Sequence, residues 1–454
     1  MATQRSSSGL FHWTLKREGI IAPDERLPWG QTIALGVQHI FAMFGATVLA
    51  PILMGFDPNT AIFFSGIGTL IFFFIVGGRI PSYLGSSFSF IAVVIAASAY
   101  AGTGPNPNID VALGGIIAAG LVYALIGVIV MAVGYQWIEY LMPPLVTGAV
   151  VMVIGLNLAP VAIADMTPTG VAASQVQFAA LMGLLTVLAT ALVAVYAPGL
   201  GRRLPVLLGG VIGYVLYLVF ANGLGWGTPI DFNGVANAAW IGMPNLTAPK
   251  FELNAITLIA PVAIILVAEN LGHVKAVSAM TGRNLDPYLG RAFLGDGVAT
   301  VVAGAFGGTG VTTYAENIGV MAVTKIYSSI VFVIAALVAI AMGFSPKFGA
   351  LISTIPSPVI GGLAIVLFGL IAATGARIWV ANGVDFSNSR NLITAAIALT
   401  MGAGNLVLNI GGFALGGIGT ATFSAIIVYQ ILRGRSSDAE TPPKSESAAT
   451  ASPI

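Results

Sequence analysis

The sequence predicts an all-α membrane protein that crosses the bilayer many times. Three observations support this fold class: the composition, the recurrence of apolar segments and the distribution of basic residues. Of the 454 residues, 57% are hydrophobic and only 8% are charged, whereas a soluble domain carries about 25% charged residues. The mean hydropathy is +0.94. So few charged side chains cannot cover this much apolar surface in water, which excludes a soluble globular domain.

Fourteen apolar segments are candidates for membrane spans, because a helix needs about 20 residues to cross a bilayer. The ninth and tenth are too short for ordinary spans. The third and tenth open with polar, strand-favouring strings at 85–90 and 312–314. We therefore expect short β-strands in spans 3 and 10. The predicted ranges are 31–53, 60–77, 85–102, 112–134, 144–164, 176–197, 204–224, 254–276, 295–307, 311–324, 327–344, 356–376, 390–410 and 414–433.

The basic residues predict the orientation. With 14 spans and a cytoplasmic N-terminus, 16 of the 18 lysines and arginines fall on the cytoplasmic side, and only Lys250 and Lys347 fall outside. Both termini are then cytoplasmic. The first 30 residues show no apolar run typical of a cleavable signal peptide, and the last 20 or so have the composition of a disordered tail.

The two halves of the chain contain similar strings of residues in the same order. The Pro- and Gly-containing string at 144–148 is followed by Gly155, and a similar string at 358–362 is followed at the same distance by Gly369. A Leu-Gly-Gly string also occurs at 208–210 and at 415–417. These matches predict two repeats of seven spans, and because seven is odd the second repeat is inverted. Inverted repeats with broken helices are typical of secondary transporters, whose site lies at the breaks.

Ionisable residues within spans are costly and usually functional. Glu269 and His273 are four residues apart, so they share a helix face and can hydrogen-bond. Such a pair can hold a proton near neutral pH. Glu316 is expected at the start of a half-helix, and Asp296 is either functional or a cap of span 9. The full set within spans is His39, Glu269, His273, Asp296 and Glu316, accompanied by Gln38 and Asn317.

The predicted site has both acceptors and donors. Glu269 and Glu316 supply carboxylates, and the half-helix starts near Phe88 and Ala315 supply backbone N–H groups. A flat ring with N–H and carbonyl groups, such as uracil, matches this pattern, whereas two ionised glutamates would repel an anion. His39 either braces neighbouring helices or contacts the ligand.

The composition also limits the other functions. The absence of cysteine excludes thiolate metal sites and cysteine nucleophiles. The Glu–His pair lacks the further ligands of a metal site, so we expect no metal and no cofactor. It also lacks the constellation that a membrane-embedded enzyme needs, and a scaffold would not need five ionisable groups in its spans. The net charge of +1 gives no indication of a nucleic-acid partner.

At these residues the sequence resembles the nucleobase–ascorbate transporter family, also called nucleobase:cation symporter-2. The resemblance covers about 27–433. The family signature is an acidic residue or Gln, then Asn, any residue, Gly, four residues, Thr and a basic residue, and residues 316–325 match it in full. The pair 38–39 and the strings 83–88 and 268–273 also match. Within the family, the chain is most similar to bacterial uracil permeases of the pyrimidine-utilisation type.

The resemblance implies a transporter, not an enzyme, that takes up uracil with protons by alternating access across the bacterial cytoplasmic membrane. Thymine or another pyrimidine is an alternative substrate. A xanthine or purine symporter of the same family is an alternative function, as is an anion transporter on the same fold. The family also suggests a homodimer in the lipid membrane. One departure is Ala315, where the well-studied uracil permease has Gly.

The resemblance also assigns residues and domains. Glu269, Glu316, Phe88 and Ala315 match substrate-binding positions, the last two through backbone N–H groups, and His273 matches a histidine linked to proton coupling. Asn317, Gln38, His39 and Asp296 are assigned supporting roles. The expected organisation is an N-terminal cytoplasmic segment (1–30), a core domain (31–134 and 254–344), a gate domain (135–226 and 345–434), an external loop (227–253) and a cytoplasmic tail (435–454).

Overall fold

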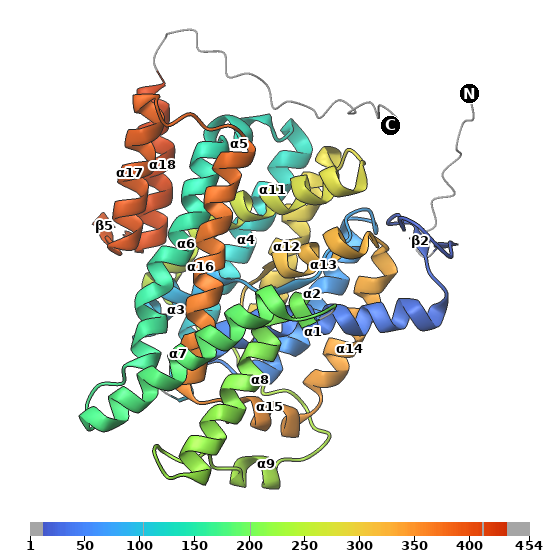
Figure 1. The fold of residues 1–454 in the computed structure, drawn as a ribbon. Coiled ribbons are helices and arrows are strands. Elements are labelled where there is room, and N and C mark those ends of the chain that lie inside the picture. Colours follow the sequence, from blue (N-terminus) through green and yellow to red (C-terminus); the bar gives the residue numbers. More distant parts are fainter. Residues whose placement is uncertain (1–11, 103, 200, 411–412, 434–454) are drawn as a thin grey trace, which may run out of the picture.

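The computed structural model describes residues 12–433, apart from 103, 200 and 411–412. The predicted tail, 435–454, lies outside the described residues. The described chain is mostly helical, as the sequence predicts (Figure 1). Each of the 14 predicted ranges contains helix.

The elements of the first half begin with two short strands that precede the first long helix. They are β1 (Thr14–Leu15), β2 (Glu25–Arg26), α1 (Trp29–Met54), α2 (Pro58–Ile75), β3 (Leu84–Ser86), η1 (Phe88–Phe90), α3 (Ile91–Ala97), α4 (Ile109–Val133), α5 (Gln136–Leu141), α6 (Pro144–Met166), α7 (Ala173–Tyr196), η2 (Gly201–Arg203), α8 (Pro205–Leu218) and η3 (Val219–Gly223).

The second half consists mainly of helices and contains three short strands. Its elements are α9 (Asn233–Asn237), α10 (Leu253–Ile259), α11 (Val262–Thr281), η4 (Asp286–Tyr288), α12 (Leu289–Phe306), β4 (Val311–Thr313), α13 (Ala315–Thr324), α14 (Ser329–Gly343), α15 (Pro346–Ile352), α16 (Ser357–Ala381), α17 (Ser389–Ala403), β5 (Leu408–Ile410), β6 (Phe413–Leu415) and α18 (Gly417–Leu432).

Many of these helices can cross a membrane. Within the described residues, nine are long and apolar enough, and α14 with α15 makes a tenth candidate that bends by 89°. The third and tenth predicted segments are broken, as expected. Each consists of a short strand followed by a short helix, β3 with η1 and α3, and β4 with α13. The chain is therefore a multi-pass membrane protein.

The prediction for the ninth segment was wrong. It was expected to be short and to begin near 295, but α12 begins at Leu289 and runs for 18 residues. Asp296 consequently lies inside the helix, fully buried, and does not cap it. The predicted boundary followed the Gly-Asp-Gly string, which here is simply part of the helix.

One other boundary differs from the prediction, and two segments contain structure that the sequence did not predict. The thirteenth segment ends as helix at Ala403, and strands β5 and β6 pair antiparallel before α18 begins. The predicted external loop contains the short helix α9. The described part of the N-terminal segment is folded, since β1 pairs with β2 and the buried Ile21 forms a bridge with Ile326.

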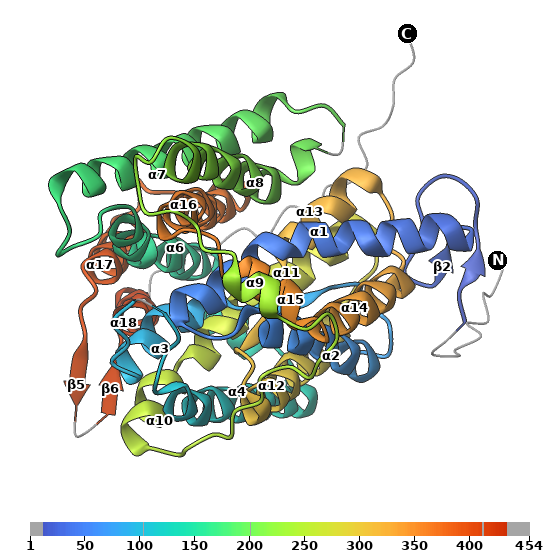
Figure 2. The same cartoon turned by 90° about the horizontal axis from the view of Figure 1, so that it is seen from below.

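The long helices form two groups, and each group mixes both halves of the chain. In the first, α16 packs against α6, α7 and α8, and α17 and α18 pack against α6. In the second, α12 packs against α4 and α2, and α14 against α1 and α2. Figure 2 shows the first group on one side of the molecule and α1, α2, α12 and α14 on the other. The strands of the broken segments pack against the second group, β3 against α1 and α2 and β4 against α12.

Small residues let α6 and α16 pack closely. A Cβ on Gly375 would lie 2.5 Å from the carbonyl oxygen of Gly148, and one on Gly155 would lie 2.2 Å from the carbonyl oxygen of Phe368. Close backbone approach at small residues is a common way to hold helices together in membranes. Lipid tails are as apolar as the helix side chains, so the hydrophobic effect does not drive helices together there. These two helices are the fifth and twelfth predicted segments, which also share the Pro- and Gly-containing strings.

Candidate functional site

Two strands from opposite halves of the chain meet at the centre of the molecule. β3 and β4 pair antiparallel, with Gly85 opposite Thr312. The pairing continues on both sides, because Ser87 N donates to the carbonyl of Gly310 at 2.9 Å and Tyr314 N donates to Tyr83 at 3.0 Å. The expectation of short strands in spans 3 and 10 is confirmed.

Each strand leads directly into a short helix. The 3-10 turn η1 begins at Phe88, with the Ser87 side chain accepting from Ser89 N at 3.3 Å, and α13 begins at Ala315. The first N–H groups of a helix have no carbonyl partner within it. Two sets of such donors therefore lie at the two ends of one strand pair, as the sequence predicts. Ala315 is exposed and Phe88 is 8% exposed.

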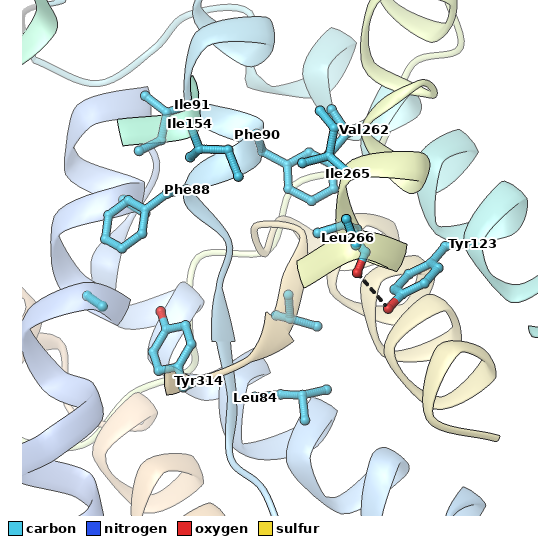
Figure 3. Close-up of a cluster of buried hydrophobic side chains, with 14 of the residues drawn as sticks. Leu84, Phe88, Phe90, Ile91, Tyr123, Ile154, Val262, Ile265, Leu266 and Tyr314 are labelled. Atoms are coloured by element: carbon cyan, nitrogen blue, oxygen red, sulfur yellow. Dashed lines mark hydrogen bonds between the residues drawn. The ribbon is translucent and has the colours of Figure 1, made fainter. Parts of the chain in front are cut away.

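Tyr314 connects the two broken segments. Its hydroxyl donates to the carbonyl of Ser86 at 2.8 Å and accepts from Thr47 Oγ1 at 3.2 Å. Its ring packs so closely on Gly85 that a Cβ there would lie 2.5 Å from Tyr314 Cζ. Figure 3 shows Tyr314 and Phe88 on the same side of strand β3. Phe88 also meets the edge of Phe368 from α16, at 5.8 Å between ring centroids, so the first helix group contacts the site.

The two predicted glutamates are brought to this centre. Glu316 lies in the first turn of α13, and Glu269 lies in the middle of α11. Both are half-buried. Ser89 Oγ donates to Glu269 Oε2 at 3.4 Å, which ties α11 to the turn η1. In the described part of the chain, neither carboxylate forms a salt bridge. Both remain available as hydrogen-bond acceptors.

His273 lies one turn after Glu269, but it bonds to a different residue. Its Nδ1 is 2.9 Å from Thr313 Oγ1 on β4. The hydrogen bond between Glu269 and His273 that the spacing allows is not formed. Residues four apart on a helix share a face, yet here Glu269 bonds to the turn η1 and His273 bonds to strand β4. The ring is half-buried.

Asp296 forms part of a buried polar cluster. Asn270 Nδ2 donates to Asp296 Oδ2 at 2.7 Å and to the hydroxyl of Tyr123 at 3.0 Å. Thr312 Oγ1 donates to Asp296 Oδ2 at 3.4 Å, whereas Asp296 Oδ1 is buried without a partner. The cluster explains how a fully buried carboxylate is accommodated within α12.

His39 and Asn317 contact each other on the other side of α13. Asn317 Nδ2 lies 3.0 Å from both Nδ1 and the carbonyl oxygen of His39, and both residues are buried. The His39 ring also packs on Phe332 at 4.6 Å. These contacts favour the bracing role for His39 over ligand contact. The neighbouring Gln38 is half-buried, and its Nε2 has no hydrogen-bond partner.

The hydrogen-bond partners of the predicted residues were not predicted from the sequence. Ser89 and Thr313 belong to strings that were used only to predict strands, although their polarity in apolar spans was a usable signal. Asn270 follows Glu269 directly and was read only as part of a motif. Tyr123 carries no signal, because a single tyrosine in an apolar helix is ordinary packing. Within the described residues, no three His, Cys, Asp or Glu side chains cluster as metal ligands.

Comparison with known proteins shows the family of this chain. A sequence model described as a permease family matches residues 30–411. A protein of Escherichia coli (strain K12) named as a pyrimidine permease, RutG, is 59% identical over 96% of this chain and 98% of its own length. This chain belongs to the nucleobase–ascorbate transporter family of permeases. It is a permease and not an enzyme.

Other relatives agree with this assignment. A uracil permease of Bacillus caldolyticus is 42% identical to this permease, over 90% of this chain and 94% of the relative.

Among solved structures, the transmembrane domain of a cyanobacterial bicarbonate transporter, BicA, matches with a TM-score of 0.59 at 17% identity, over 88% of this chain and 97% of that one. Murine Slc26a9, an anion transporter, matches with a TM-score of 0.59 at 13% identity over 88% and 67%. At these identities the two structures show a shared fold only.

Proposed function

We propose that this permease imports a neutral pyrimidine base, above all uracil, and that protons drive the import. The observation that carries the proposal is the position of Glu269 and Glu316. They come from different helices, are half-buried and lack a basic partner in the described chain, and they accompany the two helix starts at Phe88 and Ala315. The names of the relatives, pyrimidine and uracil permeases, support the same substrate class.

The chemistry of a uracil ring matches these groups. The ring has N–H donors and carbonyl acceptors in one plane. Its N–H groups would donate to the carboxylates of Glu269 and Glu316, and its carbonyls would accept from backbone N–H groups at Phe88 and Ala315. Hydrogen bonds to charged groups contribute about 1.5–3 kcal/mol each. Two carboxylates at one site disfavour bicarbonate or sulfate, which distinguishes this site from an anion site on the same fold.

The proposed proton coupling rests on the polar residues that accompany the two carboxylates. We assign His273 as the coupling residue, with Asp296, Asn317, Gln38 and His39 supporting the helices that hold it. Moving one positive charge inward gains about 2.3 kcal/mol per 100 mV of membrane potential. A neutral base that travels with one proton can therefore accumulate against its own gradient.

We further propose 14 membrane segments in two inverted repeats of seven, in the cytoplasmic membrane with both termini in the cytoplasm. The antiparallel pair of β3 and β4, one from each half, supports the repeat. The mixing of both halves in each helix group supports a core domain (31–134 and 254–344) and a gate domain (135–226 and 345–434) that move relative to each other. The family resemblance supports a homodimer.

Uptake of radiolabelled uracil into cells that express the protein tests the substrate. We expect saturable uptake that thymine and other pyrimidines reduce and that xanthine and uric acid leave largely unchanged. Glu252→Gln is the matched control for substitutions at Glu269 or Glu316, because Glu252 is an exposed carboxylate outside the site. Cells that concentrate xanthine or bicarbonate, but not uracil, would contradict the proposal.

A further inference from the structure

A chain of buried hydrogen bonds leads from Asp296 to His273. Asn270 Nδ2 donates to Asp296 Oδ2 at 2.7 Å. Asn270 Oδ1 is 3.4 Å from Thr313 Oγ1, and Thr313 Oγ1 is 2.9 Å from His273 Nδ1. Asn270, Thr313 and Asp296 are at most 1% exposed, so water does not compete for these bonds. Three elements take part: α11, α12 and β4.

The donor-to-acceptor direction of these hydrogen bonds is fixed at Asn270. A side-chain amide has two N–H donors on its nitrogen and an acceptor oxygen. The Asn270 nitrogen has two acceptors, Asp296 Oδ2 and the Tyr123 hydroxyl at 3.0 Å. The Tyr123 hydroxyl can accept there because it donates its own hydrogen to the carbonyl of Leu266 at 3.2 Å. The orientation of the amide therefore follows from the network, and Asn270 Oδ1 faces Thr313 as an acceptor.

The orientation of the Thr313 hydroxyl then determines which partner donates in its hydrogen bond with His273. The Thr313 hydroxyl has a single hydrogen. If it pointed at His273 Nδ1, the oxygens of Thr313 and Asn270 would face each other with no hydrogen between them. If it points at Asn270 Oδ1, the Thr313 oxygen is free to accept from a hydrogen on His273 Nδ1. Only the second arrangement satisfies both contacts.

We propose that Asn270 and Thr313 are positioning residues that hold neutral His273 with its hydrogen on Nδ1, which leaves Nε2 as the nitrogen that takes up and releases the transported proton. The hydrogen bond at one imidazole nitrogen determines the protonation of the other. No hydrogen bond to Nε2 forms in the described chain, and the ring is half-buried. Protonation at Nε2 gives the imidazolium with both hydrogens in place, and release restores the starting tautomer. The functional meaning rests on the proposed role of His273 in coupling.

The arrangement also connects the coupling residue to the site. Thr313 is the last residue of β4 and lies two residues before Ala315, where α13 begins. Any shift of β4 that moves the substrate-binding half-helix also changes the bond that selects the tautomer of His273. Substrate position and proton acceptance are thereby connected through one hydroxyl group.

Nitrogen NMR on the full-length, histidine-labelled protein tests the tautomer directly. The chain has three histidines, and a His273→Asn variant identifies the signals of His273. In a pH range where the ring is neutral, we expect a pyrrole-type Nδ1 and a pyridine-type Nε2. The wild-type spectrum decides the tautomer without a variant. A hydrogen on Nε2 in the wild type would overturn the proposal.

Variants at Thr313 test the cause. Thr313→Val removes the hydroxyl, and the ratio of the Nδ1–H to the Nε2–H tautomer should fall between about twofold and tenfold, as expected for one lost hydrogen bond. Thr313→Ser keeps the hydroxyl and should restore the wild-type signals. Thr186→Val is the matched control, because that buried hydroxyl donates to Met182 in α7. An unchanged ratio in Thr313→Val contradicts the proposal.

A transport measurement separates this inference from the proposed function. Thr313→Val should lower proton-driven uracil accumulation more than uracil exchange at equilibrium, and Thr313→Ser should restore it. If the spectra show Nδ1–H and its loss in Thr313→Val, but transport ignores protons, the positioning role stands and the coupling role of His273 fails. If transport is proton-driven but the wild-type hydrogen is on Nε2, the positioning role fails alone.

Discussion

Replacing Gly85 by Ala should disrupt the site, because strand β3 has no room for a methyl group. The new Cβ would lie 2.5 Å from Tyr314 Cζ and 2.6 Å from Thr47 Oγ1. The ring must therefore move, and its hydroxyl loses the bonds to Ser86 at 2.8 Å and to Thr47 at 3.2 Å. Overpacking costs about 1–3 kcal/mol and each hydrogen bond about 0.5–1.5 kcal/mol, so we expect the free energy of unfolding to fall by about 2–6 kcal/mol.

Thermal unfolding and uracil binding of the purified protein in detergent measure this effect. We expect a lower Tm and binding weakened by about tenfold or more, because Tyr314 directly precedes the half-helix that carries Glu316. Gly369→Ala is the matched control. It lies inside α16, and a Cβ there meets nothing within 4 Å. If Gly85→Ala binds uracil and unfolds as the wild type does, the close packing of Tyr314 on β3 does not position the site.

Three further predictions concern the site and the fold. Glu269→Gln and Glu316→Gln should each weaken uracil binding by about 10- to 150-fold in calorimetry, with Glu252→Gln unchanged; wild-type affinity in both would show that the carboxylates are structural. His273→Ala should lower accumulation in cells more than it lowers counterflow exchange, and equal losses in both would argue for a purely structural histidine. Gly375→Leu should abolish transport and lower the Tm, since its side chain would collide with the backbone of α6; a fully active variant would contradict the close helix crossing.

The broken segments were predictable because they contain polar residues within otherwise apolar segments. A run of serines or threonines inside an apolar segment favours a strand over a continuous span, and Glu316, three residues after Thr313, is therefore expected at a helix start. The structure confirms both expectations. The pairing of β3 with β4 was not predictable from local pattern, since about 225 residues separate the two strands.

The partners of His273 and Asp296 were not predictable from sequence spacing. Spacing along a helix points to Glu269 as the partner of His273, but the hydroxyl that bonds it comes from a strand 40 residues later. Asp296 resembled a helix cap because glycines flank it. Its true environment depends on Asn270, which reaches it from a neighbouring helix. Both outcomes depend on tertiary contacts that local pattern does not encode.

Uptake of uracil into proteoliposomes with an imposed pH gradient tests the central claim most directly. In sodium-free buffer with an acidic exterior, we expect uracil to accumulate inside, and we expect a protonophore to abolish the accumulation while exchange continues. Glu269→Gln should show neither accumulation nor exchange. Accumulation that ignores the protonophore, or that appears only when sodium is added, would contradict proton-driven import of uracil.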